Sequence, residues 1–177
     1  FQISASRRLG KKNFNHVHTA ENGKQIFLGA IPNQKDPNYL KRMNKAGVGA
    51  VLSVNEPWER HSFAQSVPFS RDDWNKAGKD YHSMDVLDHI YLNTQQLDEA
   101  ADFIHTELEA GESVYVHCKS GVGRSAMAIA AYLIKYENMT PADAAQQIQF
   151  GNEDKGIEGR KKSTIRDKFD PHPKKGE

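Results

Sequence analysis

The stretch that decides the fold covers residues 113–134 and reads SVYVHCKSGVGRSAMAIAAYLI. Residues 113–117 are mostly apolar and are typical of a buried strand. A short loop with two glycines follows, and a helix-forming run then extends from residue 125 to residue 134. A strand, a tight loop and a helix in this order predict an anion-binding cradle, because the loop N–H groups and the positive end of the helix dipole point to the same place.

The loop carries a thiol at its beginning and a guanidinium at its end. Cys118 is the only cysteine in the chain, and five residues separate it from Arg124. A helix N-terminus and nearby cations lower a thiol pKa from about 8.5 to about 3.5–7.5, so we expect Cys118 to be a thiolate. Arg124 offers a planar fork that matches two phosphate oxygens. The two residues together predict covalent attack on a phosphate.

The other residues of this segment are expected to bind the substrate. N–H groups of residues 119–124 surround the equatorial phosphate oxygens, and Gly121 and Gly123 let the main chain approach the anion closely. Ser125 is expected to donate a hydrogen bond to the Cys118 sulfur, and His117 to orient the loop rather than act as a base. The predicted substrate-binding residues are His117, Lys119, Ser120, Gly121, Val122, Gly123 and Ser125.

Other roles fit this segment less well. A lone cysteine is most often a buried and inert thiol, but the complete pattern at a strand–helix junction favours a reactive one. The nucleotide-binding pattern Gly-x-x-x-x-Gly-Lys-Ser/Thr does not occur in the sequence. One cysteine without a suitably spaced pair of histidines does not predict a zinc site, and we expect no metal or other cofactor.

The string from His117 to Ser125 resembles the active-site loop of the cysteine-dependent protein tyrosine phosphatase superfamily, in particular its dual-specificity branch. Within that branch, residues 28–32, 55–59, 114–119, 124–125 and 130–134 are similar to mitochondrial tyrosine-phosphatase-like phosphatidylglycerophosphate phosphatases, and the similarity covers about residues 26–169. The resemblance implies a phosphomonoester hydrolase with a cysteinyl-phosphate intermediate and a phospholipid headgroup substrate, phosphatidylglycerophosphate or a phosphoinositide. A protein phosphotyrosine or phosphoserine/threonine phosphatase is the alternative. A catalytically inactive phosphate-binding adaptor is the alternative from another class.

The mechanism also needs a proton donor for the leaving oxygen. Asp88 and Asp85 lie 30 and 33 residues before Cys118, after a predicted strand. We favour Asp88, because the matching acid of the lipid-phosphatase relatives lies ten residues after the glycine that opens this strand, as Asp88 does after Gly78. Asp85 stays a competitor, because the chain differs from those relatives by one residue in the loop before Leu97. Either aspartate alternatively caps a turn.

Three further features bear on the substrate. Lys119 follows the nucleophile, where phosphoinositide and phosphatidylglycerophosphate phosphatases also carry a lysine, so it is expected at the pocket floor; the alternative is a solvated lysine. Glu56 and Glu59 match a paired-glutamate loop of those relatives and are candidates for shaping the pocket or orienting Arg124, unless the loop is solvated. Trp58 is a candidate for a pocket or membrane-edge contact, with partial core burial as the alternative.

The composition agrees with one enzyme domain, since 177 residues with 37% hydrophobic and 27% charged residues suit a single core. The longest apolar run, residues 126–134, is too short to span a bilayer. A single cysteine fits a reducing compartment, and we predict a cytoplasmic, mitochondrial or membrane-peripheral location. The chain begins with Phe1 rather than methionine, which leaves open whether a targeting segment precedes it.

Charge excludes a general affinity for nucleic acid, because the net charge is +1 and no aromatic residues alternate with the basic ones. The predicted partner is a phosphorylated lipid or protein substrate, and no required protein partner is evident. Basic clusters at residues 7–8, 11–12 and 160–162 are expected to be solvated, with peripheral contact to an anionic membrane as the alternative.

Alternating strands and helices predict an α/β fold with a central, mainly parallel sheet flanked by helices, and an active-site loop at the carboxyl edge of the strands. We expect strands at residues 25–28, 47–54, 79–84 and 114–117, and helices at residues 36–46, 94–109, 125–134, 140–150 and 161–169. Residues 1–24 are predicted to be a loop-like arm, residues 25–170 the phosphatase domain and residues 171–177 a tail. The helix after Arg124 is apolar nearly all round, so it is expected to be central and buried.

Overall fold

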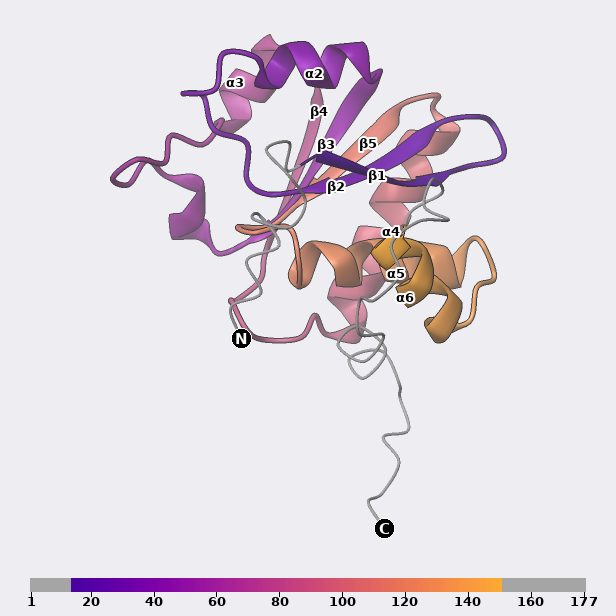
Figure 1. Ribbon diagram of the computed structural model, residues 1–177. Helices are drawn as coiled ribbons and strands as arrows, with labels where there is room; N and C mark the ends of the chain where they lie inside the picture. The colour runs from indigo at the N-terminus through magenta and orange to yellow at the C-terminus, as the bar shows by residue number, and fades with distance from the viewer. Residues whose placement is uncertain (1–13, 151–177) are drawn as a thin grey trace.

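The computed structural model describes residues 14–150, which form a five-stranded sheet with helices on both faces (Figure 1). The order of the strands in the sheet is β1-β2-β5-β3-β4, and only β1 and β2 pair antiparallel. The bounds are β1 (Phe14–Thr19), β2 (Gln25–Gly29), β3 (Val48–Asn55), β4 (Asp80–Asp85) and β5 (Ser113–His117). The predicted α/β class with a mainly parallel sheet is confirmed.

Two groups of helices cover the two faces of the sheet. One face carries α4 (Thr94–Glu109), α5 (Arg124–Lys135) and α6 (Pro141–Phe150), and the other carries α2 (Tyr39–Lys45) and α3 (Arg71–Lys76) (Figure 1). A 3-10 helix, η2 (Pro57–Arg60), follows β3. Within residues 14–150, no helix combines the length and the apolar character that crossing a bilayer requires.

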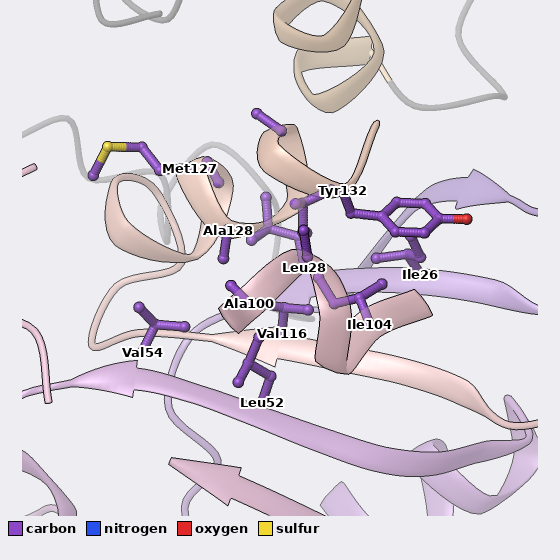
Figure 2. Close-up of a cluster of buried hydrophobic side chains, with 14 of the residues drawn as sticks. Ile26, Leu28, Leu52, Val54, Ala100, Ile104, Val116, Met127, Ala128 and Tyr132 are labelled. Atoms are coloured by element: carbon purple, nitrogen blue, oxygen red, sulfur yellow. The ribbon is translucent and has the colours of Figure 1, made fainter. Parts of the chain in front are cut away.

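The core is built by alternate strand residues. The larger cluster lies between the sheet and α4, α5 and α6 and includes Ile26, Leu28, Leu52, Val54 and Val116 (Figure 2). Intervening residues point to the other face, because side chains alternate along a strand; there Phe27, Val51 and Tyr115 pack against Met43 and Trp74. Nine of the twelve residues of α5 are buried, as predicted for the central helix. This burial fixes the N-terminus of α5 at the end of β5.

Two predicted boundaries are wrong. Residues 14–19 were expected to lie in a loop-like arm, but they form the edge strand β1, where pairing with β2 and burial of Val17 outweigh the polar composition. The first predicted helix begins at Tyr39 instead of Asp36, because the Asp36 carboxylate accepts hydrogen bonds from the Arg42 side chain and from the Asn38 N–H.

Helix α3 was not predicted. It begins with a capping box in which the Ser70 hydroxyl accepts a hydrogen bond from the Asp73 N–H, and the Asp73 carboxylate accepts one from the Ser70 N–H. The predicted helix at residues 161–169, the tail at residues 171–177 and the three basic clusters lie outside the described residues.

Candidate active site

The Cys118–Arg124 loop joins the carboxyl end of β5 to the N-terminus of α5 (Figure 1). Because β5 lies between β2 and β3, and β4 follows β3, the loops after β3 and β4 leave the sheet at the same edge. The Glu59 side chain from the loop after β3 and the Val86 carbonyl from the loop after β4 both contact Arg124.

Cys118 is buried, and its sulfur accepts two hydrogen bonds. The Gly121 N–H and the Ser125 hydroxyl donate them, each over 3.3 Å. Burial acts to raise the pKa of the Cys118 thiol, but hydrogen bonds from Ser125 and Val122 and the charge of Arg124 outweigh burial, so that the pKa is lowered. The hydrogen bond expected from Ser125 is therefore present, and the surroundings favour the thiolate.

Close packing against β2 explains the first glycine of the loop. Gly121 has a φ of +72°, and a Cβ there would lie 2.4 Å from the carbonyl carbon and oxygen of Gly29. The hydroxyl of Tyr115 donates a 2.6 Å hydrogen bond to the carbonyl of Ala30, the residue after Gly29. This hydrogen bond fixes the end of β2 against the active-site loop. Gly123, the residue before α5, has no such constraint, since a Cβ there would meet nothing within 4 Å.

The His117 ring forms a hydrogen bond with the main chain of the active-site loop. Its Nδ1 lies 3.1 Å from the Cys118 carbonyl oxygen, and because a carbonyl only accepts, Nδ1 is the donor. Burial lowers the pKa of His117 to about 4, and the charges of Arg60 and Arg124 act in the same direction. A ring that is neutral near pH 7 and already donates to the loop supports the predicted orienting role.

Arg124 is held in place by a buried carboxylate. Its Nη1 and Nη2 donate to the two carboxylate oxygens of Glu59 at 2.7 and 3.1 Å, and only 3% of Arg124 is exposed. Nη1 also donates to the Val86 carbonyl at 2.9 Å, and Nη2 lies 3.2 Å from a carboxylate oxygen of Asp88. Of the two predicted glutamates, Glu59 thus contacts Arg124, while Glu56 donates its main-chain N–H to Glu59 at 2.8 Å.

The two candidate acids differ in their partners. The Asp88 side chain is partly exposed and lies between Arg124 and His89, whose Nε2 is 3.6 Å from the second carboxylate oxygen. Asp85, at the end of β4, is ion-paired with Arg60. Only Asp88 therefore contacts the residue that is predicted to hold the phosphate, which supports the choice of Asp88.

Arg60 is a residue that the sequence did not single out. Besides its pairing with Asp85, it donates to the carbonyl of Asn55 at the end of β3 and to the carbonyl of Met84 in β4, over 3.1 and 3.4 Å. These contacts join the last residue of η2 to the ends of two neighbouring strands. A single arginine in a polar loop has no spacing pattern that predicts such a role, so no signal in the sequence identifies it.

Lys119 and Ser120 lie on the exposed outer side of the loop. The Nζ of Lys119 lies 5.0 Å from the centre of the Trp58 ring, in a cation–π contact, and its place at the pocket floor stays a prediction. Trp58 itself is half exposed rather than buried in the core. This contact joins the active-site loop to η2.

The chain belongs to a known family of phosphatases, since residues 26–167 match the model described as "Dual specificity phosphatase, catalytic domain". Over 133 residues it is 32% identical to the phosphatidylglycerophosphate phosphatase PTPMT2 of Arabidopsis thaliana, with 70% of this chain and 50% of that protein covered. Over 129 residues it is 31% identical to the phosphatidylglycerophosphatase and protein-tyrosine phosphatase 1 of Mus musculus, with 70% and 61% covered. The chain thus spans about half to three-fifths of the length of these relatives.

A solved structure agrees with this assignment. The crystal structure of PTPMT1 in complex with PI(5)P superimposes with a TM-score of 0.66 at 26% sequence identity, covering 77% of this chain and 81% of that chain. The predicted resemblance to the dual-specificity branch, and within it to phosphatidylglycerophosphate phosphatases, is confirmed.

Proposed function

We propose that this domain is a cysteine-dependent phosphomonoesterase that hydrolyses the headgroup phosphate of a phospholipid. The observation that carries the proposal is one loop in which a doubly hydrogen-bonded sulfur, Cys118, stands beside a buried guanidinium fixed by Glu59. The names of the similar proteins and the PI(5)P-bound structure support a lipid phosphate. The name of the mouse protein also includes protein-tyrosine phosphatase, so a phosphoprotein is the alternative substrate.

In the first step, the Cys118 thiolate attacks phosphorus. A sulfur–phosphorus bond forms, and the bond from phosphorus to the lipid oxygen breaks. The N–H groups of residues 119–124 and the guanidinium of Arg124 bind the three equatorial oxygens. Glu59 and the Val86 carbonyl accept both N–H groups of Nη1 and one N–H group of Nη2 of Arg124. The Nε–H and the second N–H of Nη2 are then the donors for the phosphate, and the incoming dianion competes with Asp88 for Nη2.

Asp88 supplies the proton for the leaving oxygen. Displaced from Arg124, its carboxyl donates the proton, and the lipid alcohol departs neutral. In the second step, the Asp88 carboxylate takes a proton from a water molecule that attacks phosphorus. The sulfur–phosphorus bond then breaks, inorganic phosphate leaves, and hydrogen bonds from Gly121 and Ser125 stabilise the departing thiolate.

The covalent route is tested by Cys118→Ser, which is expected to abolish turnover and keep phosphate affinity. Rapid acid quench of the parent protein with radiolabelled substrate is expected to leave label on Cys118. Full turnover in the variant, or substrate consumption without any labelled cysteine, contradicts the route.

The proton donor is tested by the matched pair Asp88→Asn and Asp85→Asn. Asp88→Asn is expected to lower kcat about 10²–10⁴-fold for alkyl phosphates, the usual contribution of a general acid, and much less for a nitrophenyl phosphate, whose leaving group needs no proton. Asp85→Asn is expected to change kcat less than about tenfold, because Asp85 is paired with Arg60. The reverse result would transfer the role to Asp85.

The substrate class is tested by comparing kcat/KM for phosphatidylglycerophosphate, phosphoinositides and phosphotyrosine peptides. A lipid is expected to give the highest value. A preference for the peptides contradicts the lipid part of the proposal and leaves the chemistry intact. The reducing compartment, the cytoplasmic or mitochondrial location and peripheral contact with a membrane stay predictions.

A further inference from the structure

The exposed large apolar side chains of the described residues lie in the two loops that follow β3 and β4. Among the described residues, the large hydrophobic side chains that are exposed by half or more are Trp58, Phe63, Leu87, Ile90 and Tyr91. Two of them lie in the loop between β3 and α3, and three in the loop between β4 and α4. We call these five side chains the apolar rim. Exposed large apolar side chains that gather in a few loops commonly mark an interaction site.

Both loops of the apolar rim adjoin the catalytic residues. The Trp58 ring contacts Lys119 of the active-site loop, and Leu87 stands between Val86, whose carbonyl binds Arg124, and Asp88. Figure 1 shows both loops extending from the same edge of the sheet as the loop that joins β5 to α5. A surface that contacts the apolar rim therefore also lies over the active site.

The composition of these loops fits an apolar environment. Residues 62–70 and 90–93 of these loops contain no Asp, Glu, Lys or Arg, and beside Trp58 and Leu87 the charged residues Glu59, Arg60 and Asp88 are paired with Arg124 or Asp85. Phe63, the most exposed of the five at 75%, lies within the first of these segments. Trp and Tyr, which supply two of the five side chains, are the residues that prefer the interface between water and lipid.

We propose that the apolar rim inserts into the surface of a phospholipid bilayer and so presents Cys118 to the headgroup phosphate. This inference rests on the proposed lipid phosphatase function, because a bilayer is the apolar surface that also displays that substrate. Insertion of residues 62–70 and 90–93 brings no charged side chain into the lipid, and Glu59, Arg60 and Asp88, beside Trp58 and Leu87, have ion-pair partners, which lowers the cost of insertion. Lys119, exposed beside Trp58, lies where it contacts anionic headgroups.

The chain contains its own reporter for this contact. Of its two tryptophans, Trp74 is 1% exposed in the core and Trp58 is 52% exposed in the apolar rim. On addition of phosphatidylcholine–phosphatidylglycerol vesicles, the fluorescence is expected to shift to shorter wavelength and to be quenched by lipids with brominated acyl chains. Trp58→Phe is expected to remove this signal while sedimentation with vesicles persists.

Polar substitutions test the other side chains of the apolar rim. Phe63→Ser and the double variant Leu87→Ser/Ile90→Ser are each expected to weaken vesicle binding about tenfold or more, the effect of removing a largely inserted side chain. Hydrolysis of the phospholipid in vesicles is expected to fall in parallel, while hydrolysis of a water-soluble aryl phosphate stays within about twofold. Gln146→Leu, which adds an exposed apolar side chain on α6, is the matched control and is expected to change neither.

The outcomes separate this inference from the proposed function. Unchanged vesicle binding in the apolar-rim variants, or no response of Trp58 while vesicle lipid is hydrolysed, overturns the inference. If the apolar-rim variants no longer bind a protein partner but bind vesicles normally, the apolar rim is a protein-binding site, and this result also overturns the inference. Vesicle binding through the apolar rim without hydrolysis of any phosphate monoester supports the inference and contradicts the proposed function.

Discussion

Glu59→Gln tests whether one buried carboxylate positions the guanidinium of the active-site loop. Glu59 accepts hydrogen bonds from both terminal nitrogens of Arg124, at 2.7 and 3.1 Å, and both side chains are almost fully buried. Glutamine has nearly the same shape, but it offers one acceptor oxygen and turns an NH₂ group toward a donor. One charge-assisted hydrogen bond and the ion pair are lost, whereas the Val86 carbonyl and Asp88 still contact Arg124.

The size of the effect follows from these contacts. Breaking a buried ion pair by removing one partner costs about 3–5 kcal/mol when the remaining charge is uncompensated. Because Arg124 keeps other acceptors, we expect a loss of about 2–3 kcal/mol in the free energy of unfolding, which lowers Tm by about 4–12 °C in a domain of this size. We expect kcat to fall about 10–100-fold, because the guanidinium is no longer fixed where charge develops in the transition state.

Thermal unfolding and steady-state kinetics on an aryl phosphate measure the two effects. Glu56→Gln is the matched control, because Glu56 holds Glu59 through its main-chain N–H, which the substitution keeps. The control is expected to lose less than about 1 kcal/mol of stability and less than about threefold in kcat. Equal losses in the two variants, or no loss in Glu59→Gln, would refute the positioning role of Glu59.

Three further substitutions test the support of the loop. Ser125→Ala removes a hydrogen bond that lowers the pKa of the Cys118 thiol. The pH at which iodoacetamide alkylates Cys118 half-maximally is therefore expected to rise, and so is the apparent pKa of the acid limb in the pH profile of kcat/KM. An unchanged apparent pKa contradicts this. Gly121→Ala brings a Cβ to 2.4 Å from Gly29 and is expected to reduce kcat/KM at least about 100-fold in a folded protein, as circular dichroism will verify. Tyr115→Phe deletes the hydrogen bonds to the Ala30 carbonyl and to the Tyr39 hydroxyl and is expected to lower the free energy of unfolding by about 1–2 kcal/mol in urea titrations.

The part of the site that could be predicted is the part that is contiguous in sequence. Cys118, Ser125 and the strand–loop–helix order occupy one short segment, whose chemistry depends on local geometry that a pattern of residues specifies. The sheet was predictable for a similar reason, since buried parallel strands are continuous apolar runs. Polar β1 escaped prediction, because its stability comes from pairing with β2 and not from its own composition.

The rest of the site depends on contacts between distant residues. Glu59 and Arg124 are 65 residues apart, and from the sequence Glu59 either shapes the pocket, orients Arg124 or lies in a solvated loop. Only the turn of η2 and the position of α5 bring the carboxylate and the guanidinium together. The same holds for Asp88 and Asp85, whose spacing to Cys118 differs by three residues, but whose partners, Arg124 and Arg60, distinguish them.

The pairing of Arg124 with Glu59 has a consequence for how the loop attracts phosphate. The pair is electrically neutral, and the Asp88 carboxylate lies beside it, so Arg124 brings no net charge that favours a dianion, and Lys119 is the other cation of the loop. The rest of the attraction comes from the N–H groups of residues 119–124 and from the N-terminus of α5, a helix of 12 residues whose dipole places about half a positive elementary charge there. Glu59 therefore orients the guanidinium of Arg124 without strengthening the binding of the substrate in its ground state. An interaction of this kind raises kcat rather than lowering KM. Glu59→Gln is accordingly expected to leave the inhibition constant of inorganic phosphate unchanged or to lower it while kcat falls. A rise of that constant in proportion to the fall in kcat would mean that Glu59 serves phosphate binding and not the transition state.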